Sequence, residues 1–199
     1  MLCVLAWAFL LRAASEATDV RRARDATPLR DPSAPLGPSS LIGLVGDTLV
    51  LRLARRKNRP HGDTLRRSCT CPGAIGASGP PGPSSHCGAL VCPAHVLWPH
   101  IARRVREGDL LFGAHDIPRH AVTWARAHLA QAGLPGATTV TLHDFRRGAA
   151  QQLYARGCRL SVILKAGSWT SRAFLAYLDK PGIESDLVSC ALAGIASDE

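Results

Sequence analysis

The sequence has no run of about 18 consecutive apolar residues, the length that a membrane-spanning helix needs. Its mean hydropathy of +0.04 also argues against a membrane protein. No internal repeat is visible along its 199 residues. Hydrophobic residues still make up 46% of the chain, which is enough for one folded domain with a core.

Acidic residues are scarce, because 15 Asp and Glu face 24 Lys and Arg and leave a net charge of +9. Lysine is scarcer still, since only three of the 24 basic residues are lysines: Lys57, Lys165 and Lys180. A strongly basic chain associates with polyanions. We therefore expect nucleic acid as the first class of partner and an acidic membrane surface as the second.

The cysteines number seven, an odd count that does not fit a complete set of disulfides. Reduced thiols are the better fit. Three of the seven look like small core residues, namely Cys3, Cys158 and Cys190.

The other four cysteines raise the alternative of a zinc site. They are Cys69, Cys71, Cys87 and Cys92. With His86 and His95 nearby, they offer enough ligands for a tetrahedral site. Their spacing is not that of a standard zinc knuckle, and a Gly- and Pro-rich stretch separates the two pairs. The favoured interpretation is therefore reduced cysteines at a strand end and a helix start, with no metal.

The first eleven residues, MLCVLAWAFLL, resemble the apolar part of a signal peptide. No positive charge precedes them, however, and the stretch is equally typical of a buried helix. We favour a helix over 1–18 that belongs to the domain of a larger protein. Its candidate core residues are Trp7, Phe9, Leu10 and Leu11. The alternative is a small secreted or interaction protein with a signal peptide at 1–17.

Strand signals occur only in the region 41–71. The preceding residues, 19–40, have four Pro and little apolar periodicity, which predicts a loop. A turn at Gly46-Asp47 leads into alternating apolar residues over 49–54, and 64–70 can return as the second strand of a hairpin. The Gly-, Pro- and Ser-rich stretch 72–86 predicts a flexible loop.

The hairpin region is also the most basic part of the chain, with seven basic residues and one acid over 52–67. Such a run suits contact with a phosphate backbone, although a solvated hairpin is the simpler explanation. The arginines predicted to contact DNA are Arg52, Arg55, Arg56, Arg59, Arg66, Arg67 and Arg147.

The rest of the chain reads as helices, over 92–107, 119–132, 141–157, 160–166, 171–178 and 183–196. The fold class predicted is α+β, mostly helical, with a small β-hairpin packed on the helices. One domain over 1–180 would be followed by a C-terminal helix or tail at 181–199.

Two motifs carry the chemistry. His143 and Arg146 are three residues apart near the start of a predicted helix, so they share one face of it. Downstream, a Gly-Ser-Trp turn at 167–169 is followed by Tyr177, ten residues after the glycine. The H-x-x-R pair alone is weak evidence, but the whole arrangement resembles the tyrosine recombinase (phage integrase) family, closest to its eukaryotic, retrotransposon-like branch. The likeness covers 141–180 best, 47–71 less well and 8–17 least.

The resemblance implies DNA strand breakage and rejoining on double-stranded DNA. In the family a tyrosine hydroxyl attacks a DNA phosphate and forms a 3′-phosphotyrosyl link, a role that falls to Tyr177. Tyr154 is a competitor, but its surroundings do not match the motif. Arg146 would clamp the phosphate oxygens with its guanidinium fork. His143 would accept or shuttle the tyrosine proton.

Three further roles follow from the resemblance. The family's general acid is a lysine of a β-hairpin, which corresponds to Lys57. Its second arginine clamp lies in an early helix near a glutamate, which corresponds to Arg12, four residues before Glu16. Trp169 would offer an indole N–H to the phosphate, or else be a core residue. No cofactor is implied, and the chain has no acidic cluster that would hold a metal.

The chain departs from the family at Ser168, where histidine or tryptophan is usual, and it lacks the family's separate N-terminal DNA-clamping domain. These departures support an alternative, a folded but inactive DNA-binding remnant of a mobile element. In the family the segment after the tyrosine often packs on a neighbouring subunit, so 183–196 would mediate self-association on DNA. The location implied is the nucleus in a eukaryote and the cytoplasm otherwise.

Overall fold

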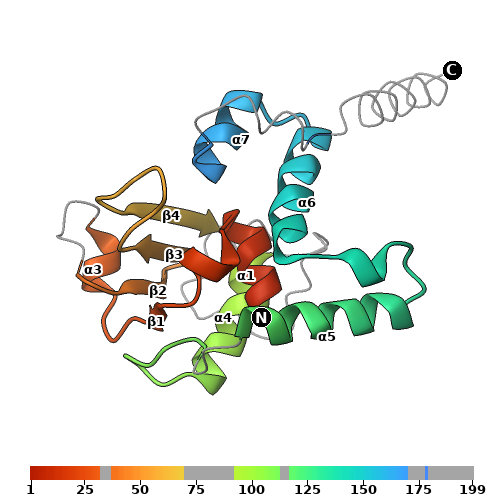
Figure 1. The fold of residues 1–199 in the computed structure, drawn as a ribbon. Coiled ribbons are helices and arrows are strands. Elements are labelled where there is room, and N and C mark those ends of the chain that lie inside the picture. The colour runs from red at the N-terminus through yellow and green to blue at the C-terminus, as the bar shows by residue number, and fades with distance from the viewer. Residues whose placement is uncertain (32–36, 70–91, 113–116, 170–177, 179–199) are drawn as a thin grey trace, which may run out of the picture.

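The computed structural model describes residues 1–31, 37–69, 92–112, 117–169 and 178, and over these residues it is an α+β fold (Figure 1). The α+β class is therefore confirmed. The elements are, in order, α1 (Leu2–Phe9), α2 (Ala13–Glu16), β1 (Val20–Arg22), α3 (Thr27–Arg30), β2 (Ser40–Val45), β3 (Thr48–Leu53), β4 (Asp63–Ser68), α4 (Pro93–Arg104), α5 (Ile117–Gln131), the 3-10 turn η1 (Ala137–Thr139), α6 (Leu142–Ala155) and α7 (Leu160–Gly167).

The strands form one mixed sheet in the order β1-β2-β3-β4. Strands β2, β3 and β4 are antiparallel neighbours, and Leu51 of β3 pairs with Leu65 of β4, which confirms the predicted hairpin. Strand β1 instead pairs in parallel with β2. The prediction of a loop over 19–40 is therefore wrong at both ends, because β1 and α3 lie within it and β2 begins at Ser40. A three-residue strand is too short to show the alternation by which strands are recognised.

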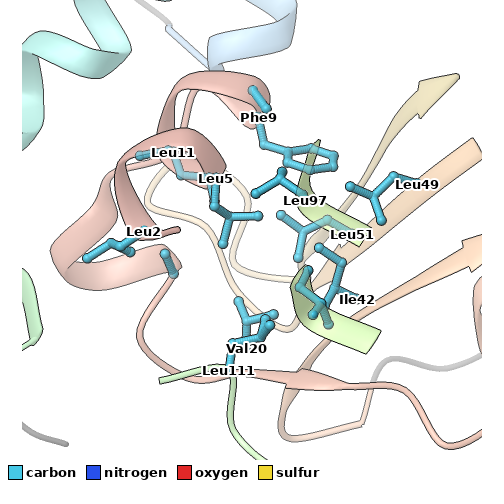
Figure 2. Packing of buried hydrophobic residues seen from close by; sticks show 14 of the residues in the cluster. Leu2, Leu5, Phe9, Leu11, Val20, Ile42, Leu49, Leu51, Leu97 and Leu111 are labelled. Atoms are coloured by element: carbon cyan, nitrogen blue, oxygen red, sulfur yellow. The ribbon is translucent and has the colours of Figure 1, made fainter. Parts of the chain in front are cut away.

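Helix α1 lies against the sheet and against α4 and fills the centre of the larger core (Figure 2). Leu5, Phe9 and Leu11 are at most 1% exposed and pack with strand residues such as Leu49 and Leu51. The buried-helix interpretation of the first eleven residues is confirmed. Cleavage at a signal-peptide site would remove this entire face of the core.

The predicted helix over 1–18 is interrupted at Leu10, which takes a left-handed conformation with φ 52°. A non-glycine residue in this region costs about 1 kcal/mol or more. Two contacts hold it there. Its side chain is 2% exposed in a second core cluster with Ala149, Ala150 and Ile163, and its carbonyl oxygen accepts a hydrogen bond of 3.3 Å from Arg56. The break turns the chain so that α2 starts at Ala13, directly after Arg12.

The C-terminal half is helical as predicted over its described part. Helix α6 begins with a capping box in which the side chains of Thr141 and Asp144 bond to each other's backbone N–H groups. Burial raises the pKa of Asp144, but the hydrogen bonds from Thr141 together with the charges of Arg147 and His143 hold that pKa below its ordinary value. The predicted helices at 171–178 and 183–196, and the predicted loop at 72–86, lie outside the described residues apart from Leu178. Among the helices described, none is long and apolar enough to cross a membrane.

Candidate functional site

The C-terminal end of α7 is held by side chains from two distant parts of the chain. Three successive carbonyl oxygens there accept hydrogen bonds from three side chains. Arg56 donates to Ala166 at 3.4 Å, Arg146 to Gly167 at 2.5 Å and Asn58 to Ser168 at 2.7 Å. The tip of the β3–β4 hairpin and the first turns of α6 therefore meet at the Gly-Ser-Trp turn. These three segments are the ones on which the motif interpretation depends.

Arg146 is one of the most deeply buried predicted site residues in the described part of the chain. Its side chain comes from the second turn of α6, is 1% exposed, and lies under the Trp169 ring at 4.4 Å from the ring centroid. A guanidinium stacked on an aromatic face in this way is stabilised by the ring quadrupole. The structure thus brings Arg146 and Trp169 together, with Trp169 packed over the guanidinium and half-buried against the second core cluster.

The glycine of the turn is required by this packing. A Cβ placed on Gly167 would overlap the Trp169 ring, so no other residue lets the ring reach the Arg146 guanidinium. Ser168, where the family usually has histidine or tryptophan, ends α7 in a left-handed conformation with φ 50°, and its side chain is buried. Ser168 therefore ends the helix, and its backbone carbonyl oxygen accepts the hydrogen bond from Asn58.

We predict that Gly167→Ala lowers the free energy of unfolding by about 1–3 kcal/mol, because the tryptophan ring must move off Arg146. The matched control is Gly148→Ala in the middle of α6, where a Cβ meets open space. That change should stabilise the protein by about 0.5–1 kcal/mol, because alanine is the better helix former. Urea unfolding of both variants measures the difference. Equal effects of the two changes would refute the packing role of Gly167.

Arg12 lies at the start of α2, and this helix packs on α6. Its guanidinium pairs with the Glu16 carboxylate at 3.2 Å, and its backbone N–H donates to the same carboxylate at 3.0 Å. The Arg12 side chain remains 26% exposed, whereas that of Glu16 is 2% exposed. The arginine and its nearby glutamate therefore pair in space despite the four-residue spacing.

Glu16 also pairs with Arg56, so that Arg12, Glu16, Arg56 and Asp63 form one network of ion pairs with Arg56 at its centre. Its side chain is fully buried, pairs with Glu16 at 3.5 Å and with Asp63 at 3.0 Å, and also donates to the carbonyl oxygens of Leu10 and Ala166. One side chain thus joins the end of α1, α2, β4 and α7. Arg56 is therefore a buried residue whose guanidinium is occupied by carboxylates and backbone oxygens, and its contact with DNA stays a prediction.

Arg52 is likewise buried, because it is 3% exposed and donates to the carbonyl oxygens of Pro28 and Asp31. Arg67 is half-buried between Phe9 and the Ala8 carbonyl oxygen, and burial lowers its pKa, helped by the charge of Arg56. Other predicted DNA-contact arginines keep exposed or half-exposed side chains: Arg55, Arg59, Arg66 and Arg147.

His143 is exposed at the first turn of α6. Partial burial lowers its pKa, and the positive charges of Arg146, Arg147 and Arg12 lower it further against the opposing effect of Asp144. His143 is therefore a neutral imidazole at neutral pH, the form that can accept a proton.

We predict that His143 titrates below 6.5, its ordinary pKa. Because its folded pKa is lowered, protonation favours the unfolded state. Stability should therefore fall as pH drops through 6.5 and below, and His143→Gln should remove that part of the pH dependence. NMR titration of the eight histidines, with His143→Gln for assignment, measures the midpoint. A midpoint at or above the ordinary value would show that burial and the neighbouring arginines do not lower the pKa of His143.

Lys57 is exposed in the tight turn closed by hydrogen bonds between Arg56 and Arg59. Its neighbour Asn58 attaches this turn to Ser168. Asn58 was not predicted as a site residue, and only its place beside Lys57 in a turn could have suggested it. Tyr177 lies outside the described residues. Among the described residues, Arg56, Asn58, Arg146 and Trp169 meet at the end of α7, and Arg12 is joined to them through Glu16. Lys57 and His143 lie on the same hairpin turn and on the same helix as these residues.

A separate group of side chains could hold a metal ion. Cys69, Cys92 and His95 place their ligand atoms within 4.8 Å of one another at the end of β4 and the start of α4. The other zinc candidates, Cys71, His86 and Cys87, lie outside the described residues.

Comparison with known proteins identifies no relative: no family model, no curated protein and no solved structure matches this chain.

Proposed function

We propose that this chain is a DNA strand-exchange enzyme of the tyrosine recombinase type, which breaks and rejoins duplex DNA through Tyr177. One observation carries the proposal. Arg56 and Asn58 of the hairpin tip and Arg146 of α6 bond to the end of α7 and the Gly-Ser-Trp turn, eight residues before Tyr177. The early arginine, Arg12, is joined to them through Glu16, which also pairs with Arg56. These segments are far apart in sequence, and the motif resemblance assigns all of them to one site.

In the proposed reaction the Tyr177 hydroxyl oxygen forms a bond to a backbone phosphorus, and the bond from phosphorus to the 5′-oxygen breaks. His143 accepts the tyrosine proton, for which its neutral form is suited. Lys57 donates a proton to the departing 5′-oxygen. Arg12 and Arg146 offset the negative charge that develops on the non-bridging oxygens. Rejoining is the reverse sequence, with a 5′-hydroxyl attacking the phosphotyrosine.

The test is trapping of a covalent intermediate on nicked duplexes with a randomised sequence, so that no target site has to be assumed. A nick beside the cleavage position lets the short 5′-hydroxyl fragment diffuse away, which leaves an adduct that survives denaturing electrophoresis. Tyr177→Phe should abolish the adduct. Tyr154→Phe removes the same hydroxyl from α6 and should leave the yield unchanged. Absence of any adduct with the wild-type chain would refute the enzymatic proposal.

One observation favours a second candidate, an inactive DNA-binding remnant. Arg146 is 1% exposed and lies under Trp169, so a phosphate can reach its guanidinium only if the ring moves. A remnant would bind duplex DNA through exposed arginines and form no adduct. Binding by either candidate should weaken steeply with salt. Arg55→Gln should reduce the salt slope by about one unit, whereas an unchanged slope would exclude the hairpin as a phosphate contact.

A further inference from the structure

The cysteine and histidine cluster at the junction of β4 and α4 has a geometry unrelated to the proposed DNA site. Cys69 follows β4 directly, and its backbone N–H donates to the Asp47 carbonyl oxygen in the β2–β3 turn at 3.0 Å. Cys92 is the N-cap residue of α4 and is 2% exposed, and His95 lies in the first turn of that helix. Two ligands from one helix turn and one from a strand end thus face each other.

The distances match those of a zinc site. The two sulfur atoms are 3.8 Å apart, and the Cys69 sulfur is 3.6 Å from Nδ1 of His95. Around a tetrahedral zinc with bonds of about 2.3 Å to sulfur and about 2.0–2.1 Å to nitrogen, the same pairs are separated by about 3.8 Å and about 3.6 Å. The cluster therefore needs little rearrangement at these two pairs to accept the ion.

The surroundings of the cluster favour bound thiolates. Cys92 lies at the positive end of the α4 dipole, which lowers the free energy of a thiolate. Soft sulfur with imidazole nitrogen selects zinc over magnesium or calcium, which prefer oxygen ligands. Zinc binding would release the protons of the two thiols and use the neutral imidazole.

We propose that Cys69, Cys92 and His95 bind one zinc ion, which fixes the end of β4 to the start of α4. These three ligands from the described part of the chain fill three tetrahedral positions, and the fourth takes a water or a further ligand. The ion would join two segments 23 residues apart in sequence and hold the sheet against the helix that carries Leu97 and Ile101 into the core. The proposal is independent of DNA chemistry, and it replaces the favoured interpretation of these cysteines as reduced residues without a metal.

The experiment measures zinc in the full-length chain, purified under reducing conditions, equilibrated with zinc chloride and desalted. Elemental analysis should find about one zinc per chain. Cys69→Ser and His95→Ala should each lose most of the bound zinc, whereas His95→Cys, which keeps a ligand, should retain it. The matched controls are Cys158→Ser and His100→Ala, the latter on the same helix, and both should bind zinc as the wild type does.

Thermal unfolding gives a second measurement, and its wild-type arm, with and without a chelator, does not depend on how well any variant folds. Chelation should lower the melting temperature of the wild type and leave that of Cys69→Ser unchanged. Wild-type protein without zinc would overturn the proposal, as would equal zinc in the ligand and control variants. Peptide mapping without reductant that finds Cys69 and Cys92 joined would also overturn it, since the pair would then be a disulfide.

Discussion

Replacement of Arg56 by methionine should lower the free energy of unfolding by about 3–5 kcal/mol, because it leaves two carboxylates without their buried partner. Glu16 would keep only Arg12, and Asp63 only the exposed Arg59 at 3.7 Å. The carbonyl oxygens of Leu10 and Ala166 would lose a donor as well. A loss of this size is a large fraction of the stability of an ordinary domain.

The neighbouring residue supplies the control for this experiment. Arg55→Met removes the same charge one position earlier, from an exposed side chain, and should change stability by no more than about 0.5 kcal/mol. Urea unfolding of the two variants measures the contrast. The double variant Arg56→Met, Glu16→Gln should recover part of the lost stability, because it removes one of the two carboxylate charges left without Arg56. Similar stability of the two single variants would contradict the central position of Arg56.

Replacement of Arg146 by lysine should reduce adduct formation about 100-fold or more if the strand-exchange proposal holds. Lysine keeps the positive charge but has no planar guanidinium, so it cannot present a rigid two-pronged fork to a phosphate or stack flat under Trp169. The assay is the rate of covalent adduct formation, with unfolding measured in parallel to show that the variant is folded.

Arg147→Lys is the matched control, since Arg147 is the next residue of α6 and its side chain is 40% exposed beside Asp144. It should change the rate less than about threefold, as expected for an exposed charge that is kept. If the two variants lose activity equally, or if Arg146→Lys is fully active, Arg146 does not stabilise the reacting phosphate.

The parts of the fold that could be predicted are those whose signal is local. Helix α6 follows from the Thr141–Asp144 capping pattern, and the β3–β4 hairpin follows from alternating leucines between two turns. Strand β1 could not be predicted, because three residues show no period and its parallel partner begins at Ser40. The break at Leu10 has no local signal either, since its strain is offset by contacts with α6, α7 and Arg56.

The candidate site likewise has features with a local sequence signal and features without one. The spacing of His143, Arg146 and the Gly-Ser-Trp turn is local, and the structure brings Arg146 and Trp169 into contact. The run of arginines over 52–67 looks like a solvated face, yet Arg52 and Arg56 are buried. Their partners, which include Asp31, Glu16 and backbone oxygens of distant elements, become neighbours only on folding. A charge pattern therefore does not tell which arginines of a basic run lie at the surface and which are buried.

The most direct test of the proposed chemistry is the identity of the residue that becomes joined to DNA. After adduct trapping and nuclease digestion, tandem mass spectrometry of the peptides locates the remaining nucleotide. The strand-exchange proposal predicts a phosphodiester on Tyr177 that is absent in Tyr177→Phe. A nucleotide on Tyr154 or on any other residue would contradict it, as would DNA bound by the folded chain with no covalent link.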